Sequence, residues 1–212
     1  MAMLPIRFTN PRLRNALLGL LSAACLAFSG GVAYVLIAEP QAVEAPIVGR
    51  FSLTDDEGQA VTEATYAGSY MLVYFGYTFC PDICPTELTK MTTALEQFEA
   101  KSPARGAKVV PVFISVDPER DTQAALKDYT DYFHARLVAL TGTPAQLRKA
   151  AKAFKAYFAK VYADERARER NEYLIDHSSQ IYLMGPDAHY LTQFTAANSA
   201  EDIAAGLDHW VQ

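Results

Sequence analysis

Two uninterrupted apolar segments constrain the fold of this chain more than any other feature of its sequence. The first covers residues 70–77 (YMLVYFGY) and the second residues 109–116 (VVPVFISV). Apolar runs of this kind, rich in β-branched and aromatic residues, are typical of strands covered on both faces. Residues 85–98 between them repeat apolar side chains at helical spacing, at Leu88, Met91, Leu95 and Phe98. The sequence therefore predicts a right-handed strand–helix–strand unit with parallel strands.

The rest of the chain continues this alternation. Further helices are expected at residues 121–133, at residues 144–158 and around Ile203, Leu207 and Trp210. Further strands are expected at residues 137–140, 179–184 and 190–194, with a hairpin turn at residues 185–188. The charged residues 164–171 are predicted to form a solvated loop. This order of elements predicts an α/β fold in which helices flank a mixed sheet.

The N-terminal part of the chain contains 23 consecutive uncharged residues, residues 16–38. As a helix they would span roughly 34 Å, enough to cross a hydrocarbon core of about 30 Å. Arg7, Arg12 and Arg14 precede this segment, whereas Glu39 and Glu44 follow it. The positive-inside rule then places the N-terminus in the cytoplasm and the rest of the chain outside. We predict a single-pass anchor in the inner membrane, with the domain facing the periplasm or an intermembrane space.

Two other fates are open for this segment. A cleaved signal peptide would have a shorter apolar run. A lipoprotein would use Cys25, but the apolar run continues well beyond that residue. The retained anchor fits better, and it gives four parts: a cytoplasmic segment (1–15), the anchor (16–38), a linker (39–46) rich in proline and acid, and one domain (47–212). A domain outside the cytoplasm lies where disulfides are permitted.

The charge of the chain excludes one class of partner. The net charge is −5, and residues 39–212 alone carry 16 basic and 24 acidic side chains, a net of −8. Phosphate contacts need clustered Lys and Arg, so we expect no nucleic-acid binding. Three Cys are too few for a disulfide-built scaffold, and the many aromatic residues exclude a disordered chain.

Cys80 and Cys84 lie where the first predicted strand passes into a helix, in the segment CPDICP. The first helical turn has unpaired N–H groups and a partial positive charge, which favour thiolate over thiol. The pair could cycle between dithiol and disulfide, or both sulfurs could hold a soft metal ion. A static disulfide is the third possibility, but it would close a very short loop and stabilise the fold little.

A histidine could complete a metal site. Of the four histidines, His177 directly precedes a predicted strand, which would anchor its ring. The other three are expected to be exposed, namely His134, His189 and His209. Asp82 and Asp176 are further possible ligands, although carboxylates prefer harder ions. Residues 117–121 (DPERD) are expected to cap the following helix and to shape the rim near the cysteines.

Four segments resemble motifs of the SCO/SenC family, the copper-binding assembly factors of cytochrome c oxidase. They are residues 74–85 (YFGYTFCPDICP), 114–122 (ISVDPERDT), 140–144 (LTGTP) and 176–183 (DHSSQIYL). The resemblance runs in order from about Val48 to the C-terminus, and an N-terminal anchor is also usual in that family. It implies a thioredoxin-like fold with an extra hairpin, and copper ligands at Cys80, Cys84 and His177. The turn at residues 185–188 (GPDA) departs from the usual Asp-Pro-Asp-Gly, which leaves its turn type open.

The resemblance leads to two hypotheses about function. In the first, the protein is a copper chaperone that passes copper to subunit II of cytochrome c oxidase. Two thiolates and one imidazole suit Cu(I), whereas structural zinc normally takes four protein ligands. In the second, the protein is a thiol–disulfide reductase that keeps the cysteines of the copper acceptor reduced. The protein is an enzyme only under this second hypothesis. Both need Cys80 and Cys84 reduced, and therefore a thiol reductant.

Two related oxidoreductase chemistries fit the residues less well. The peroxiredoxin pattern places Thr three and Pro seven positions before the reactive Cys, but Tyr77 and Val73 precede Cys80 at those positions. Three residues separate the two cysteines where thioredoxins have two. We therefore expect neither a thiol peroxidase nor an ordinary thioredoxin.

Overall fold

The computed structural model describes Arg12 and residues 46–212. The predicted anchor, the segment before it apart from Arg12, and nearly all of the linker lie outside the described residues. Among the described residues, no helix combines the length and the apolar character needed to cross a bilayer.

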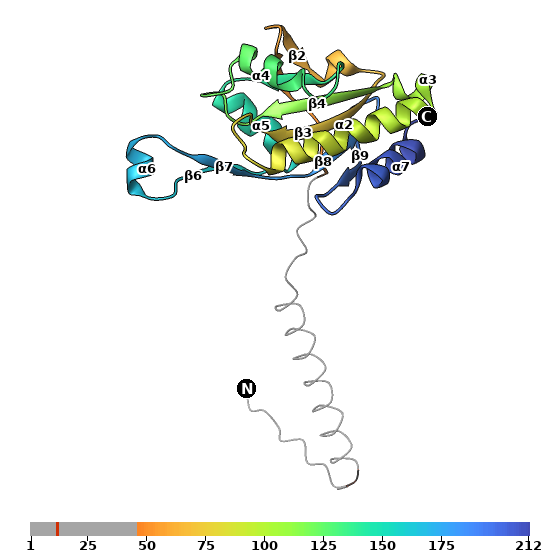
Figure 1. Cartoon of the computed structure of the whole chain (residues 1–212). Helices are drawn as coiled ribbons and strands as arrows, with labels where there is room; N and C mark the ends of the chain where they lie inside the picture. The colour runs from red at the N-terminus through yellow and green to blue at the C-terminus, as the bar shows by residue number, and fades with distance from the viewer. Residues whose placement is uncertain (1–11, 13–45) are drawn as a thin grey trace. The chain divides into compact units, whose positions relative to one another are not determined.

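A seven-stranded mixed sheet organises residues 46–212 (Figure 1). Its strands are β1 (Ser52–Asp55), β2 (Ala60–Thr62), β3 (Tyr70–Gly76), β4 (Val109–Ser115), β5 (Val138–Thr141), β8 (Ile181–Met184) and β9 (Tyr190–Phe194). They lie in the order β2-β1-β5-β4-β3-β8-β9. As predicted, β3 and β4 are parallel neighbours, and every residue of β3 is buried. Pairing between β4 and β5 begins at Val112, so Pro111, which has no N–H, precedes it.

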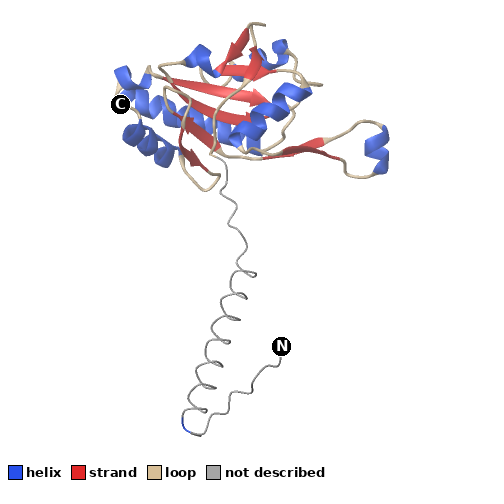
Figure 2. Ribbon diagram, turned by 180° about the vertical axis from the view of Figure 1, so that it is seen from behind, coloured by secondary structure: helices blue, strands red, loops and turns tan. Residues whose placement is uncertain are grey.

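Helices cover both faces of the sheet. The helices within residues 46–212 are η1 (Glu63–Tyr66), α2 (Ile83–Lys101), α3 (Pro103–Gly106), α4 (Gln123–Thr130), α5 (Pro144–Phe154), α6 (Glu165–Glu169) and α7 (Ala200–Trp210), of which α6 lies away from the sheet (Figure 2). Helices α2 and α7 lie side by side (Figure 1). Phe75 packs against Phe154 of α5, whereas its neighbour Tyr74 faces the side of α2 and α4. Because adjacent strand residues point to opposite faces, α2 and α5 lie on opposite sides of β3.

Two predicted helix boundaries differ from the structure. Helix α2 begins two residues before Pro85, which becomes its third residue. Proline is accepted there because the first amides of a helix have no intrahelical partner. Helix α4 is shorter than the predicted 121–133. Its cap is Thr122, whose side chain accepts from Ala125 N at 3.2 Å, because Asp121 is turned into the core.

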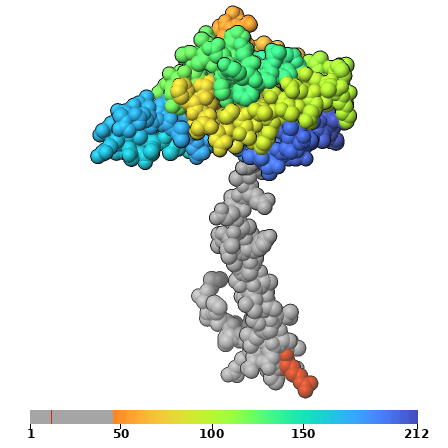
Figure 3. Space-filling view, in the orientation of Figure 1, coloured from red at the N-terminus to blue at the C-terminus, as the bar shows by residue number. Residues whose placement is uncertain are grey.

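A two-stranded hairpin replaces the predicted end of the third helix and the loop after it. Strands β6 (Phe158–Val161) and β7 (Leu174–His177) pair antiparallel, and α6 lies at the tip. The predicted helix 144–158 ends at Phe154, because Lys155 adopts a left-handed conformation at φ 54°. The hairpin projects from the sheet (Figure 2), and Figure 3 shows it in light blue beyond the rest of the surface. The solvated-loop prediction for residues 164–171 is therefore wrong about α6.

The strand predictions near the C-terminus are largely confirmed. Strand β9 has the predicted bounds, and β8 begins at Ile181 rather than at residue 179. The turn between them is closed by a hydrogen bond from Ala188 N to Gly185 O at 2.8 Å. Ala188 adopts φ 60°, so an alanine takes the left-handed conformation at the position where the family usually has glycine.

Candidate metal site

Three side chains that are far apart in the sequence meet at one end of β3. Cys80 lies in the loop after β3, Cys84 in the first turn of α2, and His177 at the end of β7. Their ligand atoms all lie within 4.8 Å of one another, and both cysteines are free thiols. Cys84 Sγ lies 3.2 Å from His177 Nε2. The structure thus brings together the three residues singled out from the sequence.

Cys84 is the most enclosed member of the cluster. Its side chain is fully buried, whereas Cys80 keeps 9% of its surface exposed. Burial raises the pKa of the Cys84 thiol far above its usual range, and the hydrogen bond with Cys80 adds to the rise. The expected preference for thiolate at the helix start is therefore wrong for Cys84 in the metal-free protein. A bound cation would supply the charge partner that a buried thiolate needs.

His177 is held in the tautomer that a metal ligand requires. Its Nδ1 lies 2.9 Å from the carbonyl oxygen of Ser178. Because a carbonyl oxygen only accepts, Nδ1 carries the hydrogen and Nε2 presents its lone pair to Cys84. Burial lowers the pKa of His177, which keeps the ring neutral. The rings of Tyr74 and Tyr77 contact the imidazole edge-on, with centroids 6.1 and 5.8 Å away.

Gly76 leaves the room that the Cys84 sulfur occupies. A Cβ atom at this position would lie 3.0 Å from Cys84 Sγ and 2.9 Å from the ring of Phe113. Contacts this short require a neighbour to move. Sequence reasoning missed this residue, although a glycine inside an otherwise apolar strand indicates a close approach.

The loop that carries Cys80 is fixed by a buried carboxylate. Asp121 is 2% exposed and accepts hydrogen bonds from Thr78 N at 3.1 Å, Thr78 Oγ1 at 2.6 Å and Ser115 Oγ at 2.6 Å. Burial raises the pKa of Asp121, and these hydrogen bonds oppose the rise. The prediction that residues 117–121 cap α4 is therefore wrong. They shape the rim of the site, and they contribute no ligand atom to the cluster.

The remaining candidates lie outside the cluster. His189 is exposed and pairs with Asp187, and His209 is exposed beside Trp210, as predicted. The exposed position predicted for His134 is wrong, because its side chain is only 8% exposed and lies 3.5 Å from a carboxylate oxygen of Glu99. Asp82 and Asp176 are exposed at the rim, and neither belongs to the Cys-Cys-His group.

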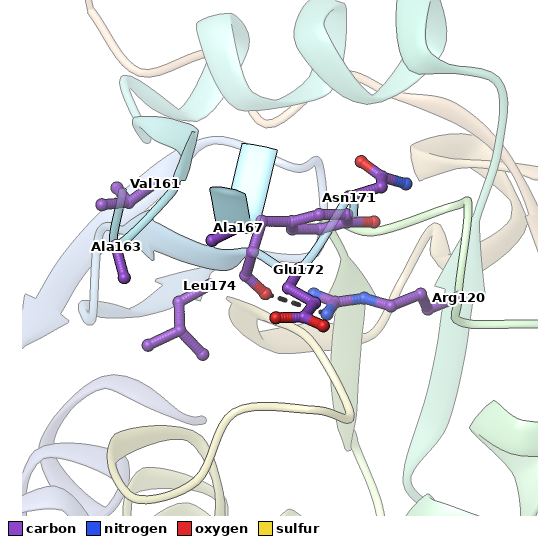
Figure 4. A pocket seen from close by; sticks show the side chains of 8 residues that line it. Arg120, Val161, Ala163, Ala167, Asn171, Glu172 and Leu174 are labelled. Atoms are coloured by element: carbon purple, nitrogen blue, oxygen red, sulfur yellow. Dashed lines mark hydrogen bonds between the residues drawn. The ribbon is translucent and has the colours of Figure 1, made fainter. Parts of the chain in front are cut away.

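Two open pockets lie along the hairpin, and one of them borders the cluster. One, of about 480 Å³, is lined by Tyr77, Cys80, Pro81, Asp82, Ile83, Val161, Leu174, Ile175 and Asp176. The second, of about 510 Å³, shares Val161 and Leu174 and extends toward α6 (Figure 4). Both shared residues are about half exposed, and Phe79 nearby is 58% exposed. Cys80 therefore borders an accessible apolar groove, whereas Cys84 does not.

A mixed sheet flanked by helices, with a Cys-x₃-Cys pair at a helix start and a facing histidine, defines a class of small α/β domains suited to metal binding or thiol chemistry. Within that class, the chain belongs to the SCO1/SenC family, whose family model matches residues 39–212. The thioredoxin-like fold that the sequence resemblance implies is thereby confirmed.

Several characterised proteins are similar to this chain. The mitochondrial SCO1 homolog 1 of Arabidopsis thaliana is 39% identical over 168 residues, which cover 79% of this chain and 48% of that protein. The chain thus spans about half the length of the first curated relatives it matches. The copper-bound structure of Bradyrhizobium japonicum ScoI is 38% identical, with a TM-score of 0.67, and covers 78% of this chain and 99% of that one. BsSco, described as a cytochrome c oxidase assembly protein with a disulfide switch, is 25% identical with a TM-score of 0.58, over 80% and 97% of the two chains.

Proposed function

We propose that this protein binds copper through Cys80, Cys84 and His177 and delivers it to subunit II of cytochrome c oxidase. The observation that carries the proposal is the convergence of the three ligand atoms within 4.8 Å, with the lone pair of His177 Nε2 directed at Cys84 Sγ. Two sulfur ligands and one neutral imidazole suit Cu(I). The copper-bound relatives support the same cargo.

Binding and release follow from the unequal exposure of the ligands. On binding Cu(I), the two thiols lose their protons and become thiolate ligands, while the neutral imidazole donates its Nε2 lone pair. In release, a donor atom of the acceptor enters through the groove beside Cys80 and replaces one ligand at a time. Cys84 stays enclosed until the ion has been taken over. The copper therefore passes between proteins without becoming a free ion.

The second candidate, a thiol–disulfide reductase, is favoured by the two adjacent free thiols and by the disulfide switch named for BsSco. The Cys80 thiolate would attack a disulfide of the acceptor and form a mixed disulfide. Cys84 would then attack Cys80 Sγ, releasing the acceptor as a dithiol and leaving a Cys80–Cys84 disulfide. A separate thiol reductant would restore the pair. In this function His177 has no required role.

We further propose that residues 16–38 anchor the domain, residues 47–212, on the outer side of the inner membrane or in an intermembrane space. The uncharged 23-residue segment and the arginines before it support this topology. The mitochondrial SCO1 and SCO2 homologs among the relatives are consistent with it. An anchor would hold donor and acceptor in the same plane.

The test is a Cu(I) competition titration of the reduced full-length chain and its His177→Ala variant under anaerobic conditions. We expect the affinity to fall by about 100-fold or more, because loss of a ligand exceeds the ten- to hundredfold cost of losing an outer partner of a ligand. His209→Ala, which removes an exposed histidine, is the matched control and should bind like the wild type. Equal affinities for all three proteins would reject the ligand set.

The same variants separate the two candidate functions. A reductase would reduce a model disulfide equally fast with and without the imidazole, whereas copper transfer to a purified subunit II fragment would fail in His177→Ala. If His177→Ala transfers copper as well as the wild type does, and the cysteines are needed only for reduction of the model disulfide, the reductase function replaces the chaperone function.

A further inference from the structure

Arg120 lies where the three segments around the metal site meet. The carbon atom of its guanidinium group lies 3.8 Å from the ring centroid of Tyr173, 4.9 Å from that of Phe79 and 5.6 Å from that of Tyr77. Tyr173 directly precedes β7, at the end of the hairpin strands that is nearer α6, whereas Phe79 lies in the loop of Cys80 and Tyr77 directly follows β3. The guanidinium pairs with the buried Asp117, and its Nη1 donates to the carbonyl oxygen of Tyr173 at 2.9 Å (Figure 4).

The hairpin depends on such side-chain contacts for its orientation. Strands β6 and β7 form a separate sheet and share no strand pairing with the seven-stranded sheet. The cysteines, in contrast, follow directly from β3 at the centre of that sheet. His177 therefore reaches Cys84 only if the whole hairpin is held at the correct angle to the cysteine loop.

Tyr173 is one point at which the hairpin is held, in addition to the hydrogen bond from Ile175 N to the Tyr77 hydroxyl. Its ring lies between Arg120 and Lys160, whose Nζ is 3.9 Å from the ring centroid. Its hydroxyl donates to Asp117 Oδ1 at 2.8 Å, and Lys160 pairs with Glu119 at 2.6 Å. The planar guanidinium can stack on a ring while it also donates hydrogen bonds in its own plane, which an ammonium group cannot do. These contacts fasten Tyr173 to residues 117–120 from several directions.

We propose that Arg120 is a positioning residue for copper binding: it fastens the start of β7 to the cysteine loop and so holds His177 Nε2, at the other end of that strand, at bonding distance from the copper held by the cysteines. The inference rests on the proposed function, because it assigns a role to a residue that is not itself a ligand. Arg120 acts through Tyr173 and the strand that leads from it to His177.

The experiment compares Cu(I) affinities in a double-mutant cycle of Arg120→Gln and His177→Ala in the full-length chain. We expect Arg120→Gln to lower the affinity by about ten- to hundredfold, the range for residues that orient a ligand. The double variant should bind no more weakly than His177→Ala alone, because the arginine acts only through the histidine. Arg120→Lys should restore little of the loss, since stacking on Tyr173 together with hydrogen bonds from Nε to Asp117 and from Nη1 to the Tyr173 carbonyl needs the guanidinium.

Arg105→Gln is the matched control. Like Arg120, Arg105 pairs with an aspartate (Asp208), contacts an aromatic ring (Phe98, at 5.1 Å) and donates to a backbone carbonyl. Unlike Arg120, it lies away from the metal site, where α3 meets α7. Its loss should lower stability without changing copper affinity. Should Arg120→Gln not fold, Tyr173→Leu removes the same stacking on the hairpin side and should give the same non-additive loss.

A metal-free measurement keeps this inference separate from the proposed function. Side-chain ¹⁵N NMR of His177 should show one fixed tautomer, protonated at Nδ1, in the wild type and tautomer exchange in Arg120→Gln. If His177→Ala leaves copper affinity unchanged, the ligand set fails and the NMR result alone decides the role of Arg120. Any of three results would overturn the inference. They are a fixed tautomer of His177 in Arg120→Gln, wild-type copper affinity in Arg120→Gln, and a loss of copper affinity in the double variant equal to the sum of the two single losses.

Discussion

Gly76→Ala should loosen the metal site by moving the Cys84 sulfur. The new Cβ would lie 3.0 Å from Cys84 Sγ, 2.9 Å from a ring carbon of Phe113 and 3.1 Å from a ring carbon of Tyr74. Gly76 is not among the glycines with positive φ, so alanine can adopt its backbone conformation. The effect of the substitution is therefore steric.

The size of the effect follows from two opposing contributions. Overpacking a filled core costs about 1–3 kcal/mol. Replacing glycine by alanine where the backbone permits it returns about 0.4–1 kcal/mol by restricting the unfolded chain. We expect a net loss of about 0–2.5 kcal/mol in the free energy of unfolding. Relief of the sulfur contact requires a movement of about 0.5 Å, the tolerance within which a site must be held, so copper affinity should fall by about tenfold.

The assay combines urea unfolding with Cu(I) competition titration. Gly106→Ala is the control, because its Cβ would lie 2.9 Å from the backbone Cα of Glu99, at the far end of α2. It should lose stability and keep wild-type copper affinity. A folded Gly76→Ala variant with unchanged affinity would refute the steric argument, as would an equal loss of affinity in Gly106→Ala.

Three further predictions concern pH and hydrogen bonds. The fold raises the pKa of Cys84, so the stability of the metal-free protein should fall above about pH 8.5, where the thiol of the unfolded chain loses its proton first. The fold lowers the pKa of His177, so the stability should also fall below about pH 6.5, where the imidazole of the unfolded chain gains a proton first. The urea midpoint at each pH measures both effects. Cys84→Ser should flatten the alkaline limb and His177→Ala the acid limb. Asp121→Asn, which disrupts the bonds to the Cys80 loop, should cost about 1–3 kcal/mol of stability and speed Cys80 alkylation. Tyr77→Phe removes the hydroxyl that accepts a hydrogen bond from Ile175 N at 3.2 Å, so the amide hydrogen of Ile175 should exchange faster. An unchanged exchange rate would show that this hydrogen bond does not protect the amide.

Local patterns were sufficient to predict the centre of the fold. The apolar runs at β3 and β4 and the periodicity of α2 depend on neighbouring residues, and the structure confirms all three. The family resemblance implies an extra hairpin, but the sequence patterns did not locate it, because its strands are short and half exposed and because Phe158 continues the apolar spacing of α5. That helix ends where Lys155 adopts the left-handed conformation. Glycine usually occupies this position after a helix, so a lysine there gives no sign in the sequence that the helix ends.

The candidate ligands could be named from the sequence, but their surroundings could not. The sequence places Cys80 and Cys84 at a helix start, and the family motif implies His177. The buried position of Cys84, which raises the pKa of its thiol, depends on packing against distant residues. The part played by Arg120 likewise depends on Tyr173, which lies 53 positions further along the chain. Contacts over such separations leave no periodic pattern in one sequence.

The geometry of the sulfur pair favours metal holding over thiol attack. In the reductase mechanism, Cys84 must act as a thiolate in the second step, when it attacks Cys80 Sγ, because the thiolate is the nucleophile. Cys84 has a raised pKa and no exposed surface, so in the metal-free protein it stays protonated beside a neutral imidazole. In the proposed function, copper would change that balance, because the cation would stabilise the thiolate that burial disfavours, and His177 already presents its lone pair. The same burial that weakens Cys84 as a nucleophile would then give the ion an enclosed ligand, and Cys80, beside the groove, would be the sulfur at which an acceptor begins the exchange.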